Sequence, residues 1–277
     1  MVSTIQIKPA PILQPFVSCY AIREFDTANA DMPKPLHAVH EYYLTFFVQG
    51  KSCSLTDAYE KVQGQVRNNL CTLFTQSQGC TYWKGRFALF HVQFKSNALF
   101  AIFGIPQKLL INTILPIEDI LGKDNNLLQE KIEASKNIYE MGEHMNAYLG
   151  NLLLKQKHKI NTITITSMSN VIFRNRGVVS LDNLSLLANM SLRNFERRFV
   201  DEVGISPKLY ARITRFYNAV ENKMLHINKT WTVIAYENGY FDQAHLIREV
   251  KEFSGKTPEQ LFEYSPPPKE NFLQKVH

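Results

Sequence analysis

The stretch MSLRNFERRFVDEVGISP, residues 190–207, decides the fold of the C-terminal part of this chain. It returns in degenerate form 51 residues later as FDQAHLIREVKEFSGKTP, residues 241–258. Each copy holds an N-cap type residue, two apolar residues four positions apart, an arginine, a glycine that can end a helix, and a Ser-Pro or Thr-Pro pair that can start the next one. The repeat therefore predicts one helical module that is present twice.

A short apolar helix pattern and a residue suited to positive φ precede each capped helix. Residues 184–188 come before Asn189 in the first copy, and residues 233–235 come before Gly239 in the second. A helix, a tight turn and a capped helix make the helix-turn-helix motif, whose second helix enters the major groove of DNA. Two such units in one chain predict that it reads two DNA segments without needing a dimer.

The segment between the two units predicts a single rigid helix. Residues 207–226 contain no glycine and a proline only at their first position, and their apolar residues recur at near-helical spacing, at Leu209, Ile213, Tyr217 and Val220. A helix of about 20 residues is about 30 Å long, and successive major-groove entries on one face of DNA lie about 34 Å apart. This helix therefore suits the task of placing two recognition helices one turn of DNA apart.

The repeat and its surroundings resemble the two-unit DNA-binding domain of the AraC/XylS family of bacterial transcription regulators. The pieces that carry the resemblance are MSLRNFERRF at residues 190–199, GISP at 204–207, IAYENGYFDQAHL at 234–246 and GKTP at 255–258. The chain departs from the family pattern at Ser185 and Asn189, where Ala and Gly are commoner, and at Val250, where Phe is usual. The resemblance covers residues from about 160 to 264 and implies a sequence-specific regulator, which we expect to be an activator that works with RNA polymerase.

Helical geometry indicates which side chains of the first recognition helix face DNA. At 100° per residue Phe195 and Phe199 lie about 40° apart, so both point inward. Arg193, Glu196 and Arg197 fall on a different arc, which is therefore expected to face outward.

The apolar stripe of the second recognition helix leaves three residues on its far side. The stripe is Leu246, Val250 and Phe253, and the residues opposite are Ala244, His245 and Arg248. The family resemblance implies base contacts from such positions, near the start and middle of each recognition helix. The complete predicted set of DNA-contacting residues is Ser191, Arg193, Asn194, Glu196, Arg197, Asp242, Gln243, Ala244, His245 and Arg248.

The chemistry of these side chains suits base recognition, although other roles stay open. Arginine can pair with guanine O6 and N7, glutamate can accept from cytosine N4, and Ala244 can touch a thymine methyl. Arg197 and Arg248 could instead form structural ion pairs, and Glu196 could hold a neighbouring arginine in place. Other basic residues of this region are expected to contact phosphates or to lie at the surface: Arg198, Lys208, Arg212, Lys251 and Lys256.

The charge of the chain agrees with a polyanionic partner but does not locate its binding site. The formal net charge is +6 and the pI is about 9.0. Residues 173–264 hold 13 Lys and Arg against 11 Asp and Glu, a net charge of only +2. The arrangement of residues, and not the net charge, therefore carries the DNA prediction.

Length and composition allow two ordinary domains, each with its own core. The chain has 277 residues, of which 45% are hydrophobic. No window approaches the roughly 18 consecutive apolar residues of a membrane span, and the N-terminus, MVSTIQ, lacks a basic segment followed by an apolar one. We therefore expect a cytoplasmic protein with no membrane partner.

The N-terminal part predicts a small β-sandwich or barrel followed by helices. Residues 42–48, 70–75 and 88–94 are short runs rich in Tyr, Phe, Val, Leu and Thr, separated by Gly or polar turns. After Gly122 an apolar stripe predicts two helices and consists of Leu127, Ile132, Ile138, Met141, Met145, Leu149 and Leu152. This order resembles the cupin-like sensory domain that many AraC-like regulators place before their DNA unit.

The predicted fold class is therefore α+β, in three parts. Residues 1–158 are expected to form a cupin-like sensory or regulatory domain, residues 159–264 the double helix-turn-helix domain, and residues 265–277 a mobile tail. The helical stripe predicts packing against its own β domain, homodimerisation through residues 135–155, or both. The expected partners are double-stranded DNA, RNA polymerase and an unidentified small-molecule effector, the last by analogy of architecture.

Two other functions stay open for the N-terminal part. A cupin-type metal enzyme would take ligands from histidines and a carboxylate on strands, and the available groups are His37, His40, Glu41 and His91. Their order does not match the usual cupin pattern, in which two His separated by one residue precede a Glu, so we expect no enzyme, no metal and no cofactor. The other alternative is a ligand-independent domain that only contacts other proteins.

The cysteines are expected to be thiols. All four, Cys19, Cys53, Cys71 and Cys80, lie in the first third of the chain without the spacing of a metal site. In a reducing cytosol buried thiols that act as small hydrophobes are the usual outcome.

Overall fold

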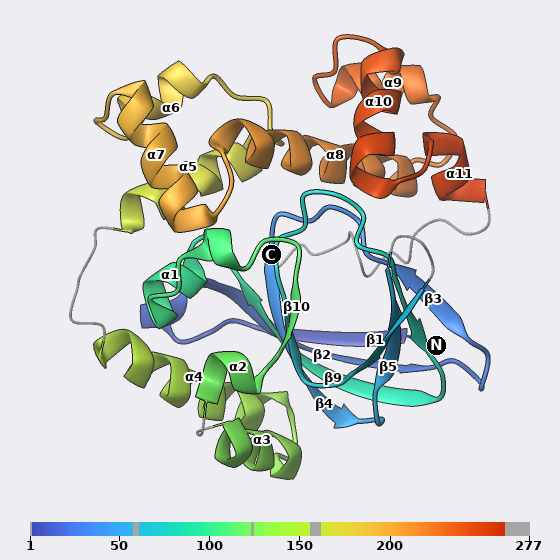
Figure 1. Cartoon of the computed structure of the whole chain (residues 1–277), viewed down its shortest axis with the longest axis vertical. Coiled ribbons are helices and arrows are strands. Elements are labelled where there is room, and N and C mark those ends of the chain that lie inside the picture. The colour runs from blue at the N-terminus through green and yellow to red at the C-terminus, as the bar shows by residue number, and fades with distance from the viewer. Residues whose placement is uncertain (1, 58–60, 123–124, 156–161, 264–277) are drawn as a thin grey trace.

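The chain folds into an N-terminal pair of β-sheets and a C-terminal set of helices that lies across one end of them (Figure 1). This computed structural model describes residues 2–57, 61–122, 125–155 and 162–263. The predicted α+β class is confirmed. The predicted domain boundary at residues 158 and 159 and the predicted tail at residues 265–277 lie outside the described residues. No helix within the described ranges has both the length and the apolar character needed to cross a membrane.

Both sheets are antiparallel. The larger sheet has the strand order β1-β2-β9-β4-β7-β10, and the smaller one has the order β3-β8-β5-β6. The strands of the larger sheet are β1 Val2–Ile7, β2 Val17–Asp26, β4 Tyr42–Gln49, β7 Asn69–Cys71, β9 Arg86–Phe94 and β10 Ile114–Pro116. Those of the smaller sheet are β3 Met32–Pro35, β5 Cys53–Thr56, β6 Val62–Val66 and β8 Cys80–Trp83.

Strands β4 and β9 supply the centre of the N-terminal core. Their register pairs Tyr42 with Phe94, Leu44 with Val92 and Phe46 with Phe90, and all six side chains are buried. Cross-strand pairs of aromatic and branched residues on one face are the unit that stabilises such a sheet. The predicted strands at residues 42–48 and 88–94 are confirmed.

The predicted strand at residues 70–75 ends early, at Cys71. The backbone N–H of Thr72 donates to the carbonyl of Thr113 at 3.1 Å, and that of Thr75 donates to Asn112 Oδ1 at 2.8 Å. The turn at residues 112–113 thus takes the hydrogen bonds that a longer strand would have needed. A distant turn ended this strand, and the local sequence pattern carries no sign of it.

Helices complete the N-terminal half. They are the 3-10 helices η1 Pro11–Leu13 and η2 Gln107–Leu109, and the α-helices α1 Ala98–Phe103, α2 Glu118–Leu121, α3 Asn125–Ala134 and α4 Ile138–Lys155. The two helices predicted after Gly122 correspond to α3 and α4.

Helix α4 packs on its own β domain. A Cβ atom added to Gly142 would lie 2.7 Å from Ile7 Cδ1, so the helix backbone approaches β1 closely. Asn146 Oδ1 accepts hydrogen bonds from the Tyr20 hydroxyl at 2.8 Å and from the Ala10 backbone at 2.9 Å. This packing realises the first alternative for the helical stripe, and homodimerisation through residues 135–155 stays a prediction.

The prediction that Leu127 belongs to the buried stripe is wrong. Leu127 is 60% exposed, whereas Leu128 and Ile132 are buried. Adjacent residues of a helix lie 100° apart, and residues four positions apart share a face. Leu128 therefore faces the core together with Ile132.

The C-terminal half is all helical within the described residues. Its helices are α5 Ile163–Arg174, α6 Leu181–Leu187, α7 Leu192–Val203, α8 Pro207–Leu225, α9 Trp231–Glu237, α10 Gln243–Ser254 and α11 Pro258–Glu263. The repeat is visible in the burial of its side chains, since Leu184 and Ser185 of α6 are buried like Ile234 and Ala235 at the equivalent positions of α9. The predicted linker helix is α8, which runs between the two units (Figure 1).

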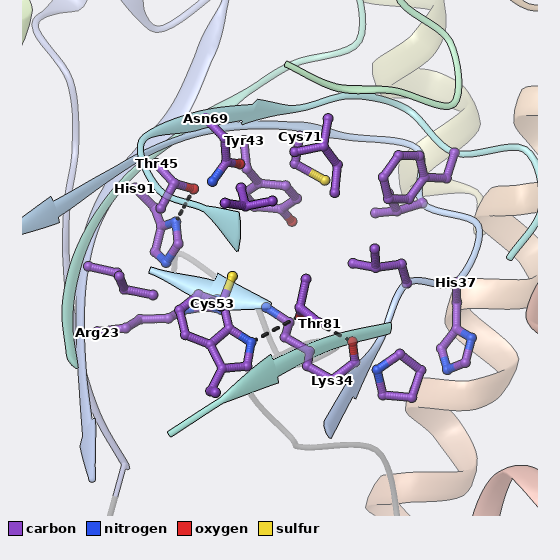
Figure 2. Close-up of a pocket in the computed structure, with 18 of the residues that line it drawn as sticks. Arg23, Lys34, His37, Tyr43, Thr45, Cys53, Asn69, Cys71, Thr81 and His91 are labelled. Carbon is purple, nitrogen blue, oxygen red and sulfur yellow. Dashed lines mark hydrogen bonds between the residues drawn. The ribbon is translucent and has the colours of Figure 1, made fainter. Parts of the chain in front are cut away.

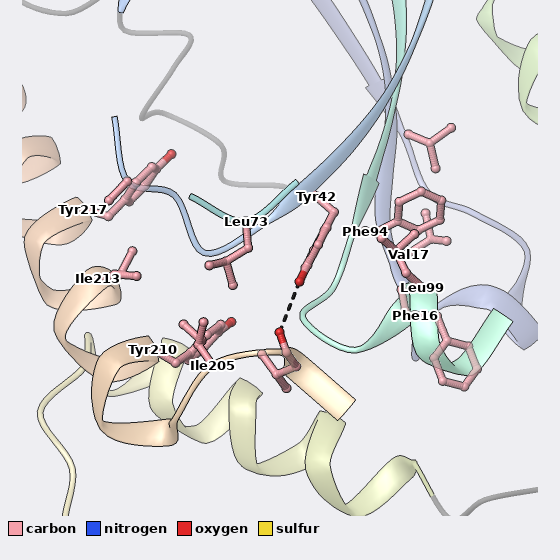
Figure 3. Packing of buried hydrophobic residues seen from close by; sticks show 14 of the residues in the cluster. Phe16, Val17, Tyr42, Leu73, Phe94, Leu99, Ile205, Tyr210, Ile213 and Tyr217 are labelled. Carbon is pink, nitrogen blue, oxygen red and sulfur yellow. Dashed lines mark hydrogen bonds between the residues drawn. The ribbon is translucent and has the colours of Figure 1, made fainter. Parts of the chain in front are cut away.

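The apolar cores of the two halves are joined. One hydrophobic cluster contains Tyr42 and Leu73 of the β domain together with Ile205, Tyr210 and Ile213 of the helical half (Figure 3). The two halves therefore share one continuous apolar cluster, and their division into separate domains stays a prediction.

His40 lies in this joined core without a hydrogen bond from its ring among the described residues. The ring contacts Phe173, Tyr210 and Tyr217, with centroid distances of 5.4, 5.8 and 5.2 Å. Burial lowers the pKa of His40, and the nearby Glu41 carboxylate, 4.0 Å from Nε2, only partly opposes this.

We predict that His40→Phe makes the protein more stable and less sensitive to acid. Below the unfolded-state pKa of about 6.5 the unfolded chain binds a proton at this position that the folded chain does not bind, so His40 disfavours the fold increasingly as the pH falls. Removing the unpaired buried ring nitrogens should raise the free energy of unfolding at pH 7 by about 1 kcal/mol. Urea unfolding at pH 7 and pH 5 measures both effects.

The exposed His226 offers a control for this measurement. His226→Gln replaces a histidine at the surface and should give none of the stabilisation at pH 7 that His40→Phe gives. A His40→Phe protein that loses as much stability between pH 7 and pH 5 as the unaltered chain would contradict the assignment.

Candidate DNA interface and internal cavity

Side-chain caps shape the first helix-turn-helix unit. Ser180 Oγ accepts from the Asn183 backbone at the start of α6, and Ser191 Oγ accepts from the Asn194 backbone at the start of α7, each at 3.4 Å. The turn between the two helices passes through Asn189, whose φ is 54°. Asparagine can replace glycine in this left-handed conformation at low cost, which explains its departure from the family pattern.

The second unit repeats these features with different residues. Thr230 Oγ1 accepts from the Val233 backbone at 3.3 Å, and Asp242 Oδ1 accepts from the His245 backbone at 2.6 Å. Gly239, with a φ of 74°, stands in the turn. Ser191 and Asp242, two members of the predicted DNA-contacting set, are therefore N-caps of the two recognition helices.

Helix α7 presents its start and middle to solvent. Phe195 and Phe199 are fully buried, whereas Arg193 is exposed and has no ion pair or side-chain hydrogen bond among the described residues. Arg197 is 68% exposed, donates to Asn194 Oδ1 at 2.9 Å and lies 3.6 Å from an Asp201 oxygen. An ion pair this exposed stabilises a protein little, so it leaves Arg197 available to another partner. Glu196, also in the predicted set, is partly exposed on the same helix.

Helix α10 has a similar outer side. Ala244 and Arg248 are exposed, and Arg248 makes no ion pair within the part of the chain that the structure describes. Gln243 Oε1 accepts from Thr232 Oγ1 at 2.6 Å. His245 is partly exposed, with its Nε2 3.5 Å from Glu249 Oε1. All predicted contact residues thus lie on the two recognition helices or at their caps, and their contact with DNA stays a prediction.

A buried ion-pair cluster fixes α10 on the linker helix α8. Glu249 Oε1, on a side chain only 3% exposed, accepts from Arg212 Nε at 2.8 Å and from an Arg215 nitrogen at 2.9 Å. Arg212 also donates to Glu252 at 2.6 Å. Arg212 is not a plain surface residue, because two acceptors on the neighbouring helix bind it, and its contact with phosphate stays a prediction. Its own helix gives no hint of these partners, and Glu249 was not predicted as a positioning residue.

Arg198 likewise has a partner in the protein. Its guanidinium donates to Glu202 Oε1 at 2.7 Å, one turn along α7. Burial raises the pKa of Glu202, while Arg198 and Asn97 act against this shift. Arg198 is therefore not a plain surface residue either, and its contact with phosphate stays a prediction. Lys208, Lys251 and Lys256 are exposed, as expected.

A cavity of about 150 Å³ lies between the two sheets. Figure 2 shows Tyr43, Asn69 and Cys71 across the open space from Arg23, Lys34 and Cys53. Most of the remaining wall is apolar, and Tyr217 of helix α8 also reaches it. A sequence pattern could not bring these residues together, because they come from both sheets and from a helix.

Two basic side chains, Arg23 and Lys34, lie in the wall of the cavity. Tyr43, another wall residue, donates a hydrogen bond to the Glu41 carboxylate at 2.5 Å. Burial lowers the pKa of His91 well below its usual value, with Arg23 and Lys34 adding to the shift, so this ring is neutral. Burial also raises the pKa of Cys53 to about 11 and that of Cys71 to about 12, which keeps both thiols uncharged.

The candidate ligands of a metal enzyme do not form a metal site. His91 Nδ1 lies 3.0 Å from Thr45 Oγ1 in the wall of the cavity, whereas His40 lies among aromatic rings of the helical half. No group of three or more His, Cys, Asp or Glu side chains within the described ranges could hold a metal ion. All four cysteines are free thiols, Cys19 and Cys53 buried and Cys71 and Cys80 partly buried.

Comparisons with known proteins identify one part of the chain. A family model described as a helix-turn-helix domain matches residues 184–264. A crystal structure of ToxT from Vibrio cholerae aligns with a TM-score of 0.46 and 9% identity, over 86% of this chain and 95% of that one. Another, of ToxT with an unsaturated fatty acid bound, aligns with a TM-score of 0.45 and 10% identity, over 89% of this chain and 97% of that one. No curated protein sequence matches the chain significantly.

We predict that Glu249→Ala lowers the free energy of unfolding by about 3 kcal/mol, because it leaves Arg212 and Arg215 without their shared carboxylate. Urea unfolding followed by circular dichroism measures the change. Glu252→Ala removes the half-exposed partner of Arg212 and should cost less than about 1 kcal/mol. Equal effects of the two substitutions would mean that the buried cluster does not hold α10 in place.

Proposed function

We propose that this chain, whose residues 184–264 form an AraC-type helix-turn-helix domain, is a transcription regulator that reads two adjacent major-groove segments of promoter DNA. The observation that carries the proposal is that both α7 and α10 expose one side of the helix to solvent in the same way. Each of these helices buries its apolar stripe and leaves on its outer side an arginine, Arg193 or Arg248, that forms no ion pair with the residues that the structure describes. Arginine in this position can form a bidentate pair with guanine.

The length of the linker helix supports the proposal that a single chain binds both DNA segments. Helix α8 has 19 residues, Pro207–Leu225, and separates the two units. At about 1.5 Å per residue it is about 28 Å long, which is close to one turn of DNA. Such a protein acts at the chromosome, so we expect it in the cytoplasm, and activation would require a further contact with RNA polymerase.

The cavity between the sheets supports modulation by a small molecule. Its volume of about 150 Å³ suits a molecule of roughly the size of benzene. Two cations and largely apolar walls favour a ligand with one anionic group on a compact apolar body. We therefore propose a small organic carboxylate as the effector class. A metal-dependent enzyme gains no support from the residues at this cavity.

The experiment that tests the function is selection of bound duplexes from a random pool with the full chain. The proposal expects a consensus with two short conserved blocks whose centres lie about one turn of DNA apart. Recovery of sequences with no consensus, or with one block only, would contradict it.

We predict that Arg193→Ala weakens binding to the selected duplex by about 1–3 kcal/mol and relaxes the preference at one base position. Fluorescence anisotropy on selected and random duplexes at one salt concentration measures both. Arg86→Ala removes an exposed arginine of the β domain that pairs with Asp26, and should change neither binding constant. An equal loss on selected and random DNA would assign Arg193 to phosphates instead.

We also predict that benzoate stabilises the chain whereas benzyl alcohol, of similar size but uncharged, does not. A ligand present at 100 times its dissociation constant adds about 2.7 kcal/mol to the free energy of unfolding. Thermal unfolding with each compound measures the difference, and Lys34→Met should abolish the benzoate effect. Stabilisation by both compounds alike, or by neither, would contradict an anionic effector of this size.

A further inference from the structure

The two recognition helices end at equivalent positions against the β domain. Helix α7 ends with Glu202 and Val203, and helix α10 ends with the residues 51 positions later, Phe253 and Ser254. A glycine with positive φ follows each helix, Gly204 at 90° and Gly255 at 74°. The last carbonyls of a helix have no partner within it and need donors from elsewhere.

The β domain supplies these donors to α7. The Tyr42 hydroxyl donates to the Val203 carbonyl at 3.2 Å (Figure 3), and Gln107 Nε2 donates to the Glu202 carbonyl. Gln107 is fully buried, and the same Nε2 also donates to the Ser96 carbonyl at 2.7 Å. A Cβ atom added to Gly204 would lie 2.9 Å from the Gln107 carbonyl carbon, so the end of α7 touches η2 directly.

The same two positions of α10 also receive contacts from the β domain. The Ala38 backbone N–H donates to the Phe253 carbonyl at 2.9 Å. The adjacent His37 interacts with the backbone of Ser254. Burial lowers the pKa of His37, and this interaction partly opposes that change. The carbonyls of Glu202 and Phe253, at equivalent positions of the two recognition helices, are therefore both bound by the N-terminal half, at the ends opposite to those that carry the predicted base contacts.

One short segment connects these contacts with the cavity. We name residues 34–43 the junction segment. It contains Ala38 and Tyr42, which donate to the two helices, and Lys34, His37 and Tyr43, which line the cavity. A molecule in the cavity thus touches the same piece of backbone that binds α7 and α10.

From this arrangement we propose that the N-terminal half sets the spacing of the two DNA segments, because it binds the C-terminal ends of both recognition helices through Tyr42, Gln107 and residues 37–38. The inference rests on the proposed DNA-reading function and deepens it. It differs from a model in which α8 alone fixes the spacing. Tyr42 and Gln107 are in this view positioning residues, since neither lies on a recognition helix.

The test compares spacing preference in the full-length protein. Duplexes carry the two selected blocks with zero, one or two base pairs added or removed between them, and each base pair shifts one block by about 3.4 Å and about 34°. The unaltered chain should lose about 10-fold in affinity for each base pair that is added or removed between the blocks. Tyr42→Phe combined with Gln107→Met should reduce this penalty to below about 3-fold, with affinity for a duplex that holds one block unchanged.

A matched control removes another buried tyrosine hydroxyl. Tyr20→Phe deletes the hydrogen bond to Asn146, which lies within the N-terminal half, and should keep the spacing profile of the unaltered chain. If the double variant also keeps that profile, α8 alone fixes the spacing and the inference is overturned.

A second measurement is independent of DNA. Spin labels at Asp201→Cys and Lys251→Cys, two exposed sites at the ends of α7 and α10, report the distance between the helices in a chain whose native cysteines are replaced by alanine. We expect one narrow distance distribution that broadens or shifts with Tyr42→Phe and Gln107→Met but not with Tyr20→Phe. An unchanged distribution overturns the inference even if the variant no longer binds DNA. Absence of specific DNA binding by the unaltered chain would instead reject the proposed function, and the distance measurement would still decide the role of the two residues.

Discussion

The structure depends on the binding of unpaired helix carbonyls by a neighbouring β domain. Each recognition helix ends in a glycine turn that leaves carbonyls without a partner inside the helix. The Tyr42 hydroxyl, the Gln107 amide and the Ala38 backbone meet these carbonyls in a region from which water is largely excluded. Because these hydrogen bonds form inside a shared apolar cluster, separation of the halves would expose that cluster to water, and the halves are more stable together than apart.

This constraint explains why the two halves share one core. The joined hydrophobic cluster excludes water from the polar contacts and brings His40 against Tyr210 and Tyr217. It also brings Tyr217 of the linker helix to the wall of the cavity. A small molecule between the sheets would therefore contact the junction segment and the linker helix, two of the elements that determine where α7 and α10 lie.

The sequence predicts those features that local chemistry determines. The caps at Ser191 and Asp242, the turns at Asn189 and Gly239 and the buried faces of α7 and α10 follow from side chains within one or two turns of each residue. The strands at residues 42–48 and 88–94 follow from aromatic and branched runs. These predictions succeed because the information that specifies each feature lies inside the segment that adopts it.

Contacts between distant segments could not be predicted in this way. Tyr42 meets Val203 across 161 positions of sequence, and Arg212 meets Glu249 across 37. Arg212 and Arg198 have the sequence context of surface residues, and only the placement of their acceptors shows that they are structural. The prediction that a strand extends to residue 75 is wrong for the same reason, because hydrogen bonds from Asn112 and Thr113 end the strand at Cys71. Arg23 and Lys34 of the cavity come from different sheets, so no spacing rule relates them.

Hydroxyl-radical footprinting of the full chain on a selected duplex tests the central claim most directly, when it is combined with a measurement of stoichiometry. The account predicts that one chain protects two segments on one face of the duplex, centred about 10 base pairs apart. Protection of a single segment by each chain, with the second segment protected only when a second chain binds, would contradict it.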